Sequence, residues 1–407
     1  MPEIDPGRLL GDLRELAKFG AYRTGVHRPT FSPQDVEARH WFADRLAGAG
    51  LDATIDGIGS VFGFSRAPGP KILTGSHVES QNYAGWLDGP LGIVYGLETA
   101  RAFREDPATA DLGVDVAAWC DEEGHFGSFL GSRSFVGLLS EEEIDKAKNR
   151  YDGTPLRDAL DKAGFAGRPR VQVESGRHRA YFEAHIEQGD TLESTGLKIG
   201  VVTAIVAIWQ YRLTATGEQN HAGTTSMTRR RDAGLAIVRL LGEIDRRFPA
   251  LAGPRSVWTC GRIALEPGAP SIVPGRAEAL FQFRDADPAV LDRLQAELHR
   301  LVEEASRTGP CPVEIEVMGQ STPALMDESL QGAIEAAAQK RCPGKALRMP
   351  SGAGHDAQYL ARVMPAAMLF VPSIGGISHH WTENTSDEDI VLGAQVFCDA
   401  VARMLRS

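Results

Sequence analysis

The sequence lacks a long hydrophobic run, an excess of basic residues and any close pair of cysteines. Its longest apolar run, residues 200–209, falls well short of the roughly 20 residues that a membrane-spanning helix needs. Lys and Arg number 43 against 54 Asp and Glu, and the net charge of −11 argues against a nucleic-acid partner. The five cysteines are scattered without a CxxC motif, and the acidic N-terminus shows no signal peptide. We therefore expect a soluble, cytoplasmic protein with reduced thiols that binds neither membranes nor nucleic acids.

The chain does have the length and apolar content for more than one folded domain. Its 407 residues predict two or three domains, and 43% hydrophobic with 24% charged residues is an ordinary globular composition. The first half alternates strand and helix patterns, with a buried strand at 71–77, a helix at 89–103 and a further strand at 114–120. This succession predicts an α/β sheet covered by helices, and ligands of such sheets collect at the carboxyl ends of the strands.

The middle of the chain changes pattern. Apolar residues alternate with polar ones from Trp209 to Ala215, as in a half-buried strand. A helix, two strands, a helix and a strand then follow at 231–248, 256–265, 276–284, 287–306 and 312–318. The order β-α-β-β-α-β predicts a ferredoxin-like domain inserted into a larger one. The expected domains are a first part of the larger domain at 1–208, the inserted domain at 209–321, and a second part at 322–407.

Helical spacing predicts which side of the first helix in the inserted domain is buried. Its expected core face comprises Ala233, Leu235, Ala236, Val238, Leu240, Leu241 and Ile244. After the insertion, the larger domain resumes with a helix at 328–340, a buried strand at 366–371 and a last helix at 387–405, which Ser386 caps.

Polar clusters follow several of the predicted strands. The first holds His77 and, eleven residues later, Asp88, a combination of imidazole and carboxylate that suits a divalent metal. Glu79 is the residue expected to fix the tautomer of the His77 ring. The second cluster holds the adjacent acids Glu122 and Glu123, of which one can bind metal while the other acts as a general base.

Two further histidines complete a set of ligands. His185 ends an alternating strand at 181–185, and His379 follows a glycine loop after the strand at 366–371. Three histidines, an aspartate and a glutamate are what two metals sharing one carboxylate require. These ligand types accept Zn, Mn, Co or Ni, so the metal stays open. The other histidines of polar or helical surroundings are expected to be ordinary surface or half-buried residues, namely His27, His40, His178 and His299.

Motifs around these residues resemble the M20 family of two-metal amidohydrolases. The resemblance is to the hydantoinase/carbamoylase branch, which contains N-carbamoyl-L-amino-acid hydrolases, β-ureidopropionases and allantoate amidohydrolases. It runs nearly end to end through GSHVESQNYAGWLDG, CDEEGHFGSFLGSRSF, EAHIEQG, NHAGTTSMTRRRDA, SGAGHDA and FVPSIGGISH. It implies an α/β catalytic domain like that of two-metal exopeptidases, with an inserted dimerisation domain, and therefore a homodimer.

The resemblance also implies a role for each metal-site residue. Asp88 would bridge two metals, with His77 and His185 on one of them. Glu123 and His379 would hold the other metal.

Catalysis and substrate binding are implied in the same way. Glu122 would be the general base, and His221 of the inserted domain would polarise the scissile carbonyl in the other subunit. The rest of the substrate would be bound by Gln210, Ser271, Arg284, Gly354 and His355, with Arg284 gripping a carboxylate through both nitrogens of its fork.

The sequence departs from the family pattern near the substrate. Glu79 stands where the family usually has aspartate, Ser271 where asparagine is expected, and Gln282 where an acid is usual. Trp86 and His125 are unusual neighbours of the site. The hydrolytic residues are complete, whereas the substrate pocket differs from the usual one.

The expected function is metal-dependent hydrolysis of a linear amide or ureido C–N bond. The substrate would be a small carboxylated molecule, an N-carbamoyl amino acid or a related ureido acid. Two alternatives stay open: an N-acyl-amino-acid amidohydrolase or dipeptidase with the same metals and base, and a relative that binds ligands without catalysis.

Overall fold

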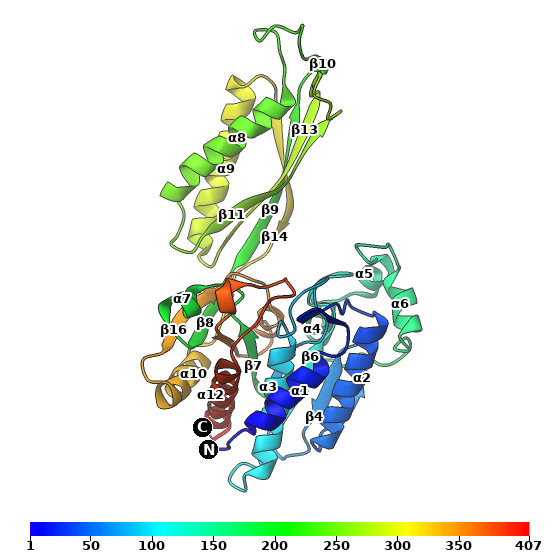
Figure 1. The fold of residues 1–407 in the computed structure, drawn as a ribbon, viewed down its shortest axis with the longest axis vertical. Helices are drawn as coiled ribbons and strands as arrows, with labels where there is room; N and C mark the ends of the chain where they lie inside the picture. Colours follow the sequence, from blue (N-terminus) through cyan, green and yellow to red (C-terminus); the bar gives the residue numbers. More distant parts are fainter. Residues whose placement is uncertain (407) are drawn as a thin grey trace. The chain divides into compact units, whose positions relative to one another are not determined.

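The computed structural model describes residues 1–406, which divide into two compact units (Figure 1). Unit 1 comprises Met1–Thr203 together with the chain from Leu325 onward, and unit 2 is Ala204–Ala324. The boundaries expected from the sequence were 209 and 321. No helix in the described part of the chain is both long and apolar enough to cross a membrane.

Unit 1 is built on a nine-stranded sheet of order β15-β8-β17-β7-β5-β6-β4-β3, with β16 beside β8. Its central pairs β17–β7, β7–β5 and β5–β6 are parallel. The strands are β3 Asp52–Ile55, β4 Val61–Phe64, β5 Lys71–His77, β6 Val114–Trp119, β7 His178–Ile186, β8 Ile199–Ile205, β15 Ala324–Leu325, β16 Ala346–Ser351 and β17 Ala366–Val371. The mixed α/β fold expected from the sequence is thus present.

The central strands are apolar because helices shield them from water. Strands β5, β6 and β17 are buried along their whole length. The main helices are α1 Pro6–Leu16, α2 Pro33–Gly48, α3 Pro90–Glu105, α10 Glu328–Arg341 and α12 Asp387–Arg406; shorter ones are α4 Leu130–Phe135, α5 Glu141–Lys146, α6 Leu156–Lys162, α7 Thr191–Thr195 and α11 Ala357–Leu360. Proline at the first position and a serine cap start α2, and Ser386 accepts the Asp389 N–H at the start of α12, as expected.

The alternation expected of the strand that carries His185 is wrong. Strand β7 is buried without interruption from Ala180 to Ile186. It lies between β17 and β5 in the middle of a parallel sheet, where both faces are covered and continuous apolar burial is the rule. His178, at the start of this strand, is half-buried as expected, with a side chain that is 2% exposed and an Nε2 that lies 2.9 Å from Asp115 Oδ2.

Unit 2 contains a four-stranded antiparallel sheet of order β11-β13-β9-β14. Two long helices pack on it, and a two-stranded ribbon of β10 and β12 forms a separate small sheet. The elements are β9 Ala207–Thr216, β10 Asn220–His221, α8 Ala233–Arg247, β11 Val257–Glu266, β12 Ile272–Val273, β13 Arg276–Asp285, α9 Pro288–Thr308 and β14 Val313–Gln320. Omitting the ribbon, their chain order is β-α-β-β-α-β.

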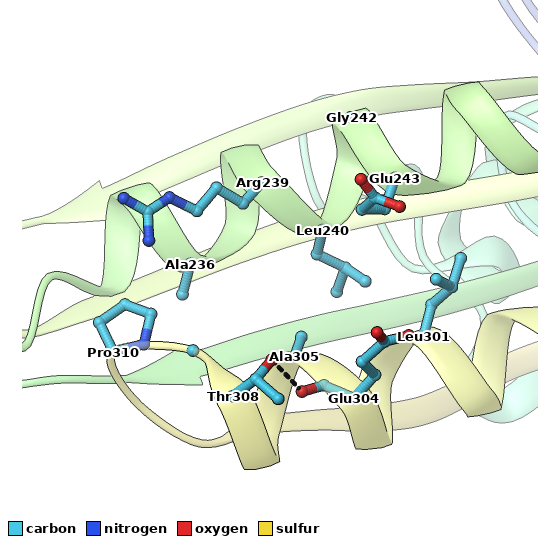
Figure 2. A pocket seen from close by; sticks show the side chains of 11 residues that line it. Ala236, Arg239, Leu240, Gly242, Glu243, Leu301, Glu304, Ala305, Thr308 and Pro310 are labelled. Carbon is cyan, nitrogen blue, oxygen red and sulfur yellow. Dashed lines mark hydrogen bonds between the residues drawn. The ribbon is translucent and has the colours of Figure 1, made fainter.

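One residue that was predicted to lie on the buried side of α8 is exposed instead. Val238 is 57% exposed, whereas its neighbour Ile237 is fully buried. The sheet covers only a narrow stripe of α8, so one of two adjacent aliphatic residues must face outward. A groove of about 520 Å³ lies between α8 and α9 (Figure 2). Among the described residues that line it are Leu240, Leu301 and Arg239, and none of the site residues expected from the sequence.

Candidate metal centre

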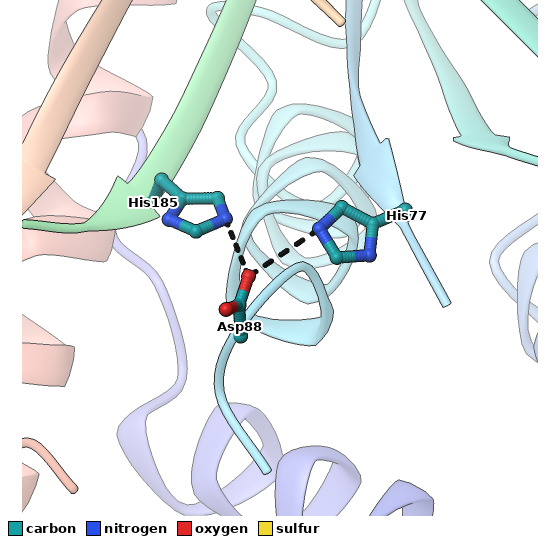
Figure 3. Close-up of side chains that lie close together, drawn as sticks. All are labelled: His77, Asp88 and His185. Atoms are coloured by element: carbon teal, nitrogen blue, oxygen red, sulfur yellow. Dashed lines mark ion pairs between the residues drawn. The ribbon is translucent and has the colours of Figure 1, made fainter. Parts of the chain in front are cut away.

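The carboxyl ends of the parallel strands bring three ligand candidates together. His77 is the last residue of β5, His185 lies near the end of β7, and Asp88 precedes α3. Asp88 Oδ1 lies 3.4 Å from His77 Nε2 and 3.0 Å from His185 Nε2 (Figure 3). All three side chains are buried. Gly89, at φ +84°, permits this approach, because a Cβ there would overlap the His77 ring.

The second oxygen of Asp88 belongs to another group. Asp88 Oδ2 lies 3.3 Å from His379 Nε2, which in turn lies 3.8 Å from Glu123 Oε2. In each of the two groups, the candidate ligand atoms lie within 4.8 Å of one another. His379 is half-exposed and adopts φ +54°, an uncommon backbone conformation that accompanies functional sites. All five ligand residues named from the sequence therefore meet, with Asp88 common to both groups.

The tautomers of the buried histidines suit metal binding. His77 Nδ1 lies 2.9 Å from the carbonyl oxygen of Glu79, and His185 Nδ1 lies 2.9 Å from that of Ile186. Each Nδ1–H donates to its carbonyl, so Nε2 is the nitrogen that faces Asp88 and is available to a cation once it carries no proton. His77 Nε2 is buried without a hydrogen bond. Such nitrogen and carboxylate donors fit divalent cations of the zinc or manganese type.

The expectation that the Glu79 carboxylate holds the His77 ring is wrong. The backbone carbonyl of Glu79 performs that task, and its carboxylate points elsewhere. The extra methylene of glutamate carries the acid past the imidazole to other partners.

Charges in the centre shift one another's pKa values. The hydrogen bond to Asp88 raises the pKa of His379 to about 9. Burial opposes a charge on His77, but Glu122 and Asp88 nevertheless raise its pKa well above the ordinary value. Burial likewise disfavours the Asp88 carboxylate, yet the surrounding histidines hold its pKa well below the usual range. The contacts around Asp88 thus favour the charged form of both the imidazoles and the carboxylate.

Glu122 is placed beside the two groups without belonging to either. Its carboxylate lies 3.8 Å from His77 Nε2 and is 10% exposed. Burial raises its pKa well above the ordinary glutamate value, which suits a group that accepts and returns a proton. It sits on a tight turn after β6 in which Asp121 takes φ +59° and accepts the N–H groups of His125 and Gly127. Aspartate tolerates this left-handed conformation better than most residues.

Several residues that support the centre were missed from the sequence. Gln188 donates to Asp88 Oδ2 at 2.9 Å, and Gln81 donates to Glu123 Oε2 at 2.9 Å. The buried Glu383 accepts the Asp88 N–H at 3.1 Å and the Ser378 hydroxyl at 2.9 Å. Gln188 lies in the motif EAHIEQG and Gln81 in the motif GSHVESQNYAGWLDG. Both glutamines are thus close in sequence to a predicted ligand, and that closeness could have marked them as candidates for the site.

Other expected site residues of unit 1 lie close to the ligands without joining them. His355 is buried with its ring 4.6 Å from that of His185, and its Nε2 lies 2.9 Å from the Ser351 hydroxyl. Its neighbour Gly354 faces the ring of Phe129. His125 and Trp86, which are unusual for the family at these positions, also make side-chain hydrogen bonds. His125 is hydrogen-bonded to the Thr30 hydroxyl, and the indole N–H of Trp86 donates to Asn384.

The four expected residues of unit 2 form two separate pairs. His221 and Ser271 are neighbours, because β10 pairs with β12 and the Ala222 N–H donates to the Ser271 carbonyl. Gln210 lies opposite Gln282 on β13, and Arg284 contacts Gln282 on the same face. Between Ile208, opposite Arg284, and Thr216, which leads to the ribbon, β9 spans about 26 Å. No single small molecule can therefore touch both pairs of one chain.

Comparison with known proteins agrees with this geometry. The family model described as peptidase family M20/M25/M40 matches residues 71–403. The chain belongs to this family. Two relatives of the M20 chain are an N-carbamoyl-L-amino-acid amidohydrolase of Rhizobium meliloti, 32% identical over 98% of this chain and 96% of that protein, and an allantoate amidohydrolase of Bacillus subtilis, 31% identical over 96% and 95%.

A solved structure extends the likeness to the whole fold. An amidase of the hydantoinase/carbamoylase family from Burkholderia phymatum superposes with a TM-score of 0.94 at 49% identity, covering 100% of this chain and 99% of that one. The family resemblance proposed from the sequence motifs is confirmed.

Metal binding by this M20 chain should release protons. His379 has its pKa raised to about 9, so it is protonated below that pH, while only the neutral imidazole binds metal. Metal affinity should therefore rise with pH up to about 9, not merely to the unperturbed histidine value of about 6.5. Titration calorimetry in buffers of different ionisation enthalpy measures the protons released. An affinity that stayed constant between about pH 7 and 9 would contradict this pKa.

Proposed function

We propose that the chain is a metal-dependent amidohydrolase that cleaves a linear ureido or amide C–N bond in a small carboxylated substrate. An N-carbamoyl amino acid or a related ureido acid is the favoured substrate class. The observation that carries the proposal is the pair of ligand groups sharing Asp88, with Glu122 alongside. The relatives named for N-carbamoyl-amino-acid and allantoate hydrolysis support the substrate class.

The prediction of an enzyme that hydrolyses carbon–nitrogen bonds is confirmed by the family and its named amidohydrolases. We propose that His77 and His185 would hold one cation and that Glu123 and His379 would hold a second, with Asp88 as a ligand of both. Bound divalent cations supply Lewis acidity, which polarises a carbonyl and acidifies water. Glu122 removes the proton from the attacking water and delivers it to the leaving nitrogen. Zinc, manganese, cobalt and nickel all suit these ligands.

Arg284 is proposed to bind the substrate carboxylate. Arg284 is half-buried, and this burial lowers the pKa of its guanidinium. A partly desolvated guanidinium binds a carboxylate more strongly than an exposed one, and its fork matches both oxygens. Gln210 and Gln282 lie on the same face and can bind other polar atoms of the substrate.

A homodimer is proposed because one copy of unit 2 cannot supply all the substrate contacts. His221 and Arg284 are separated along β9 by more than the length of a small ureido acid. If both contact the same substrate, they come from different subunits. His221 is suited to polarising a carbonyl, since its Nδ1 accepts the N–H groups of Gly223 and Thr224 and its Nε2 is left to donate. The proposed compartment is the cytoplasm.

The N-acyl-amino-acid or dipeptide alternative shares the metals and the base, so only turnover separates it from the main proposal. Ser271 is shorter than the asparagine usual in the family and leaves more room beside His221. A relative that binds without catalysis would retain metal but hydrolyse nothing.

Substrate choice and the role of Arg284 can be tested together. With Mn or Zn added, the chain should hydrolyse N-carbamoyl amino acids or ureido acids in a panel that also holds N-acetyl amino acids and dipeptides. Arg284→Ala should lower kcat/KM for carboxylated substrates by at least about 100-fold, and Arg284→Lys should recover little, because a point charge cannot copy the fork. Amide-capped analogues should change little. Equal losses on capped and carboxylated substrates would rule out the carboxylate clamp.

The two adjacent glutamates should respond differently to loss of charge. Glu122→Gln should retain metal while lowering turnover by at least about 100-fold, since the base is removed. Glu123→Gln should lose metal, because a ligand is removed. Metal analysis and kcat measured on the same samples distinguish them, and exchanged phenotypes would reverse the assignment.

Action of His221 across subunits can be tested by mixing. Glu122→Gln and His221→Ala subunits should each be inactive, yet heterodimers should regain part of the activity, because one of their two sites then has both native residues. The control is each variant taken alone through the same exchange procedure. No recovery despite demonstrated subunit exchange would place the action of His221 within its own chain or outside catalysis.

A further inference from the structure

Behind the metal centre lies a chain of fully buried charges. Arg39, on α2, donates through Nε to Asp35 at 2.8 Å and through Nη2 to Glu79 at 2.6 Å. The side chains of all three residues have 0% exposure. Arg39 also donates to the Gly59 carbonyl at 2.7 Å, and Asp35 accepts the Phe31 N–H at 2.8 Å. The guanidinium is thus fixed on several sides.

The other oxygen of Glu79 is directed at the general base. Glu79 Oε1 accepts the backbone N–H of Glu122 at 2.7 Å, while Oε2 receives Arg39. The carboxylate therefore joins a rigid arginine to the peptide that carries Glu122. A charged acceptor makes this a stronger bond than one between neutral groups, and its burial keeps water from replacing it.

We propose that Arg39 and Glu79 form a positioning pair that holds the peptide of Glu122, and through it the proton-transferring carboxylate. This inference rests on the proposed role of Glu122. Neither residue touches the substrate; both act through the backbone of the base. The turn that bears Glu122 contains Asp121 in a left-handed conformation, and the Glu79 carboxylate holds the Glu122 N–H from outside that turn.

Side-chain length explains why glutamate occupies position 79. The carboxylate must reach Arg39 and the Glu122 N–H at once, and both distances are already those of good hydrogen bonds. Shortening the side chain by one methylene withdraws the carboxylate by about 1.5 Å, too far to keep both contacts. The hydrogen bond of the His77 ring should be kept in this variant, because its partner is the backbone carbonyl of residue 79.

The test is Glu79→Asp, which keeps the charge and shortens the arm. Misplacement of a catalytic group by about 1 Å can cost about 100-fold in rate, so kcat should fall by about 10- to 100-fold. KM and the content of two metals per chain should stay unchanged, because neither substrate contacts nor ligands are altered. Arg39→Lys should also lower kcat, because lysine cannot replace the several hydrogen bonds of the guanidinium. The loss should be smaller than in Glu79→Asp, because the positive charge beside Glu79 remains.

A second readout does not depend on activity. In protein labelled with ¹⁵N-glutamate, the Glu122 amide can be assigned by its disappearance in Glu122→Gln. In Glu79→Asp its proton resonance should move upfield and exchange faster with solvent, as expected when a charge-assisted hydrogen bond is lost. This measurement stands even if the substrate panel yields no turnover, so failure of the proposed function and failure of this inference can be told apart.

Glu98→Asp is the matched control. Glu98 is also fully buried and also joins an arginine to a backbone N–H, accepting Arg8 Nε at 2.8 Å and the Asp5 N–H at 2.8 Å. It lies two turns into α3 and contacts no residue of the metal centre in the described chain. Its shortening should lower stability without lowering kcat.

Three results would overturn the inference. Unchanged kcat and an unchanged Glu122 amide in Glu79→Asp would show that the pair positions nothing. Loss of metal in Glu79→Asp would show that the Glu79 carboxylate supports the metal ligand His77 and not the base Glu122. An equal loss of kcat in Glu98→Asp would reduce the effect to general destabilisation.

Discussion

A carboxylate removed from water must be met by positive charge or by hydrogen-bond donors, and Asp88 is met by both. Three imidazoles approach its two oxygens, while Gln188 adds a donor to one of them and Glu383 accepts its backbone N–H. These groups come from three segments of unit 1, which contain His77, His185 with Gln188, and His379 with Glu383. The parallel strands matter because they end on one edge of the sheet and so deliver residues distant in sequence to the same carboxylate.

The sequence allowed correct predictions where a feature depends on a local pattern of residues, such as a polar residue directly after a buried strand. Strand-to-loop transitions pointed to His77, His185, His379 and the Glu122–Glu123 pair, and the spacing after His77 pointed to Asp88. The family resemblance implied the role of each residue. The α/β fold and the order of elements in unit 2 also followed from apolar periodicity. In these cases each residue's position depends mainly on its own strand or helix and on how that element ends.

The sequence failed where a side chain is placed by partners far along the chain. Nothing local indicates that the Glu79 carboxylate meets Arg39, 40 residues earlier, or that Glu383 supports the backbone of Asp88. The choice between Ile237 and Val238 depends on which stripe of α8 faces the sheet, and adjacent aliphatic residues leave that open. The buried strand β7 departed from alternation for a related reason, because the cover on its second face comes from other elements.

The path of the chain between the two units bears on how such a protein can arise. It leaves unit 1 after β8 and returns on β15, and these two strands are neighbours in the sheet. On the side of unit 2, β9 and β14 are also paired, with Trp209 opposite Gln320. Unit 2 is thus inserted between two neighbouring strands of the sheet of unit 1. An insertion with adjacent entry and exit leaves the strand order of its host intact, so the host fold can gain, lose or exchange it as a genetic module while its chemistry evolves separately.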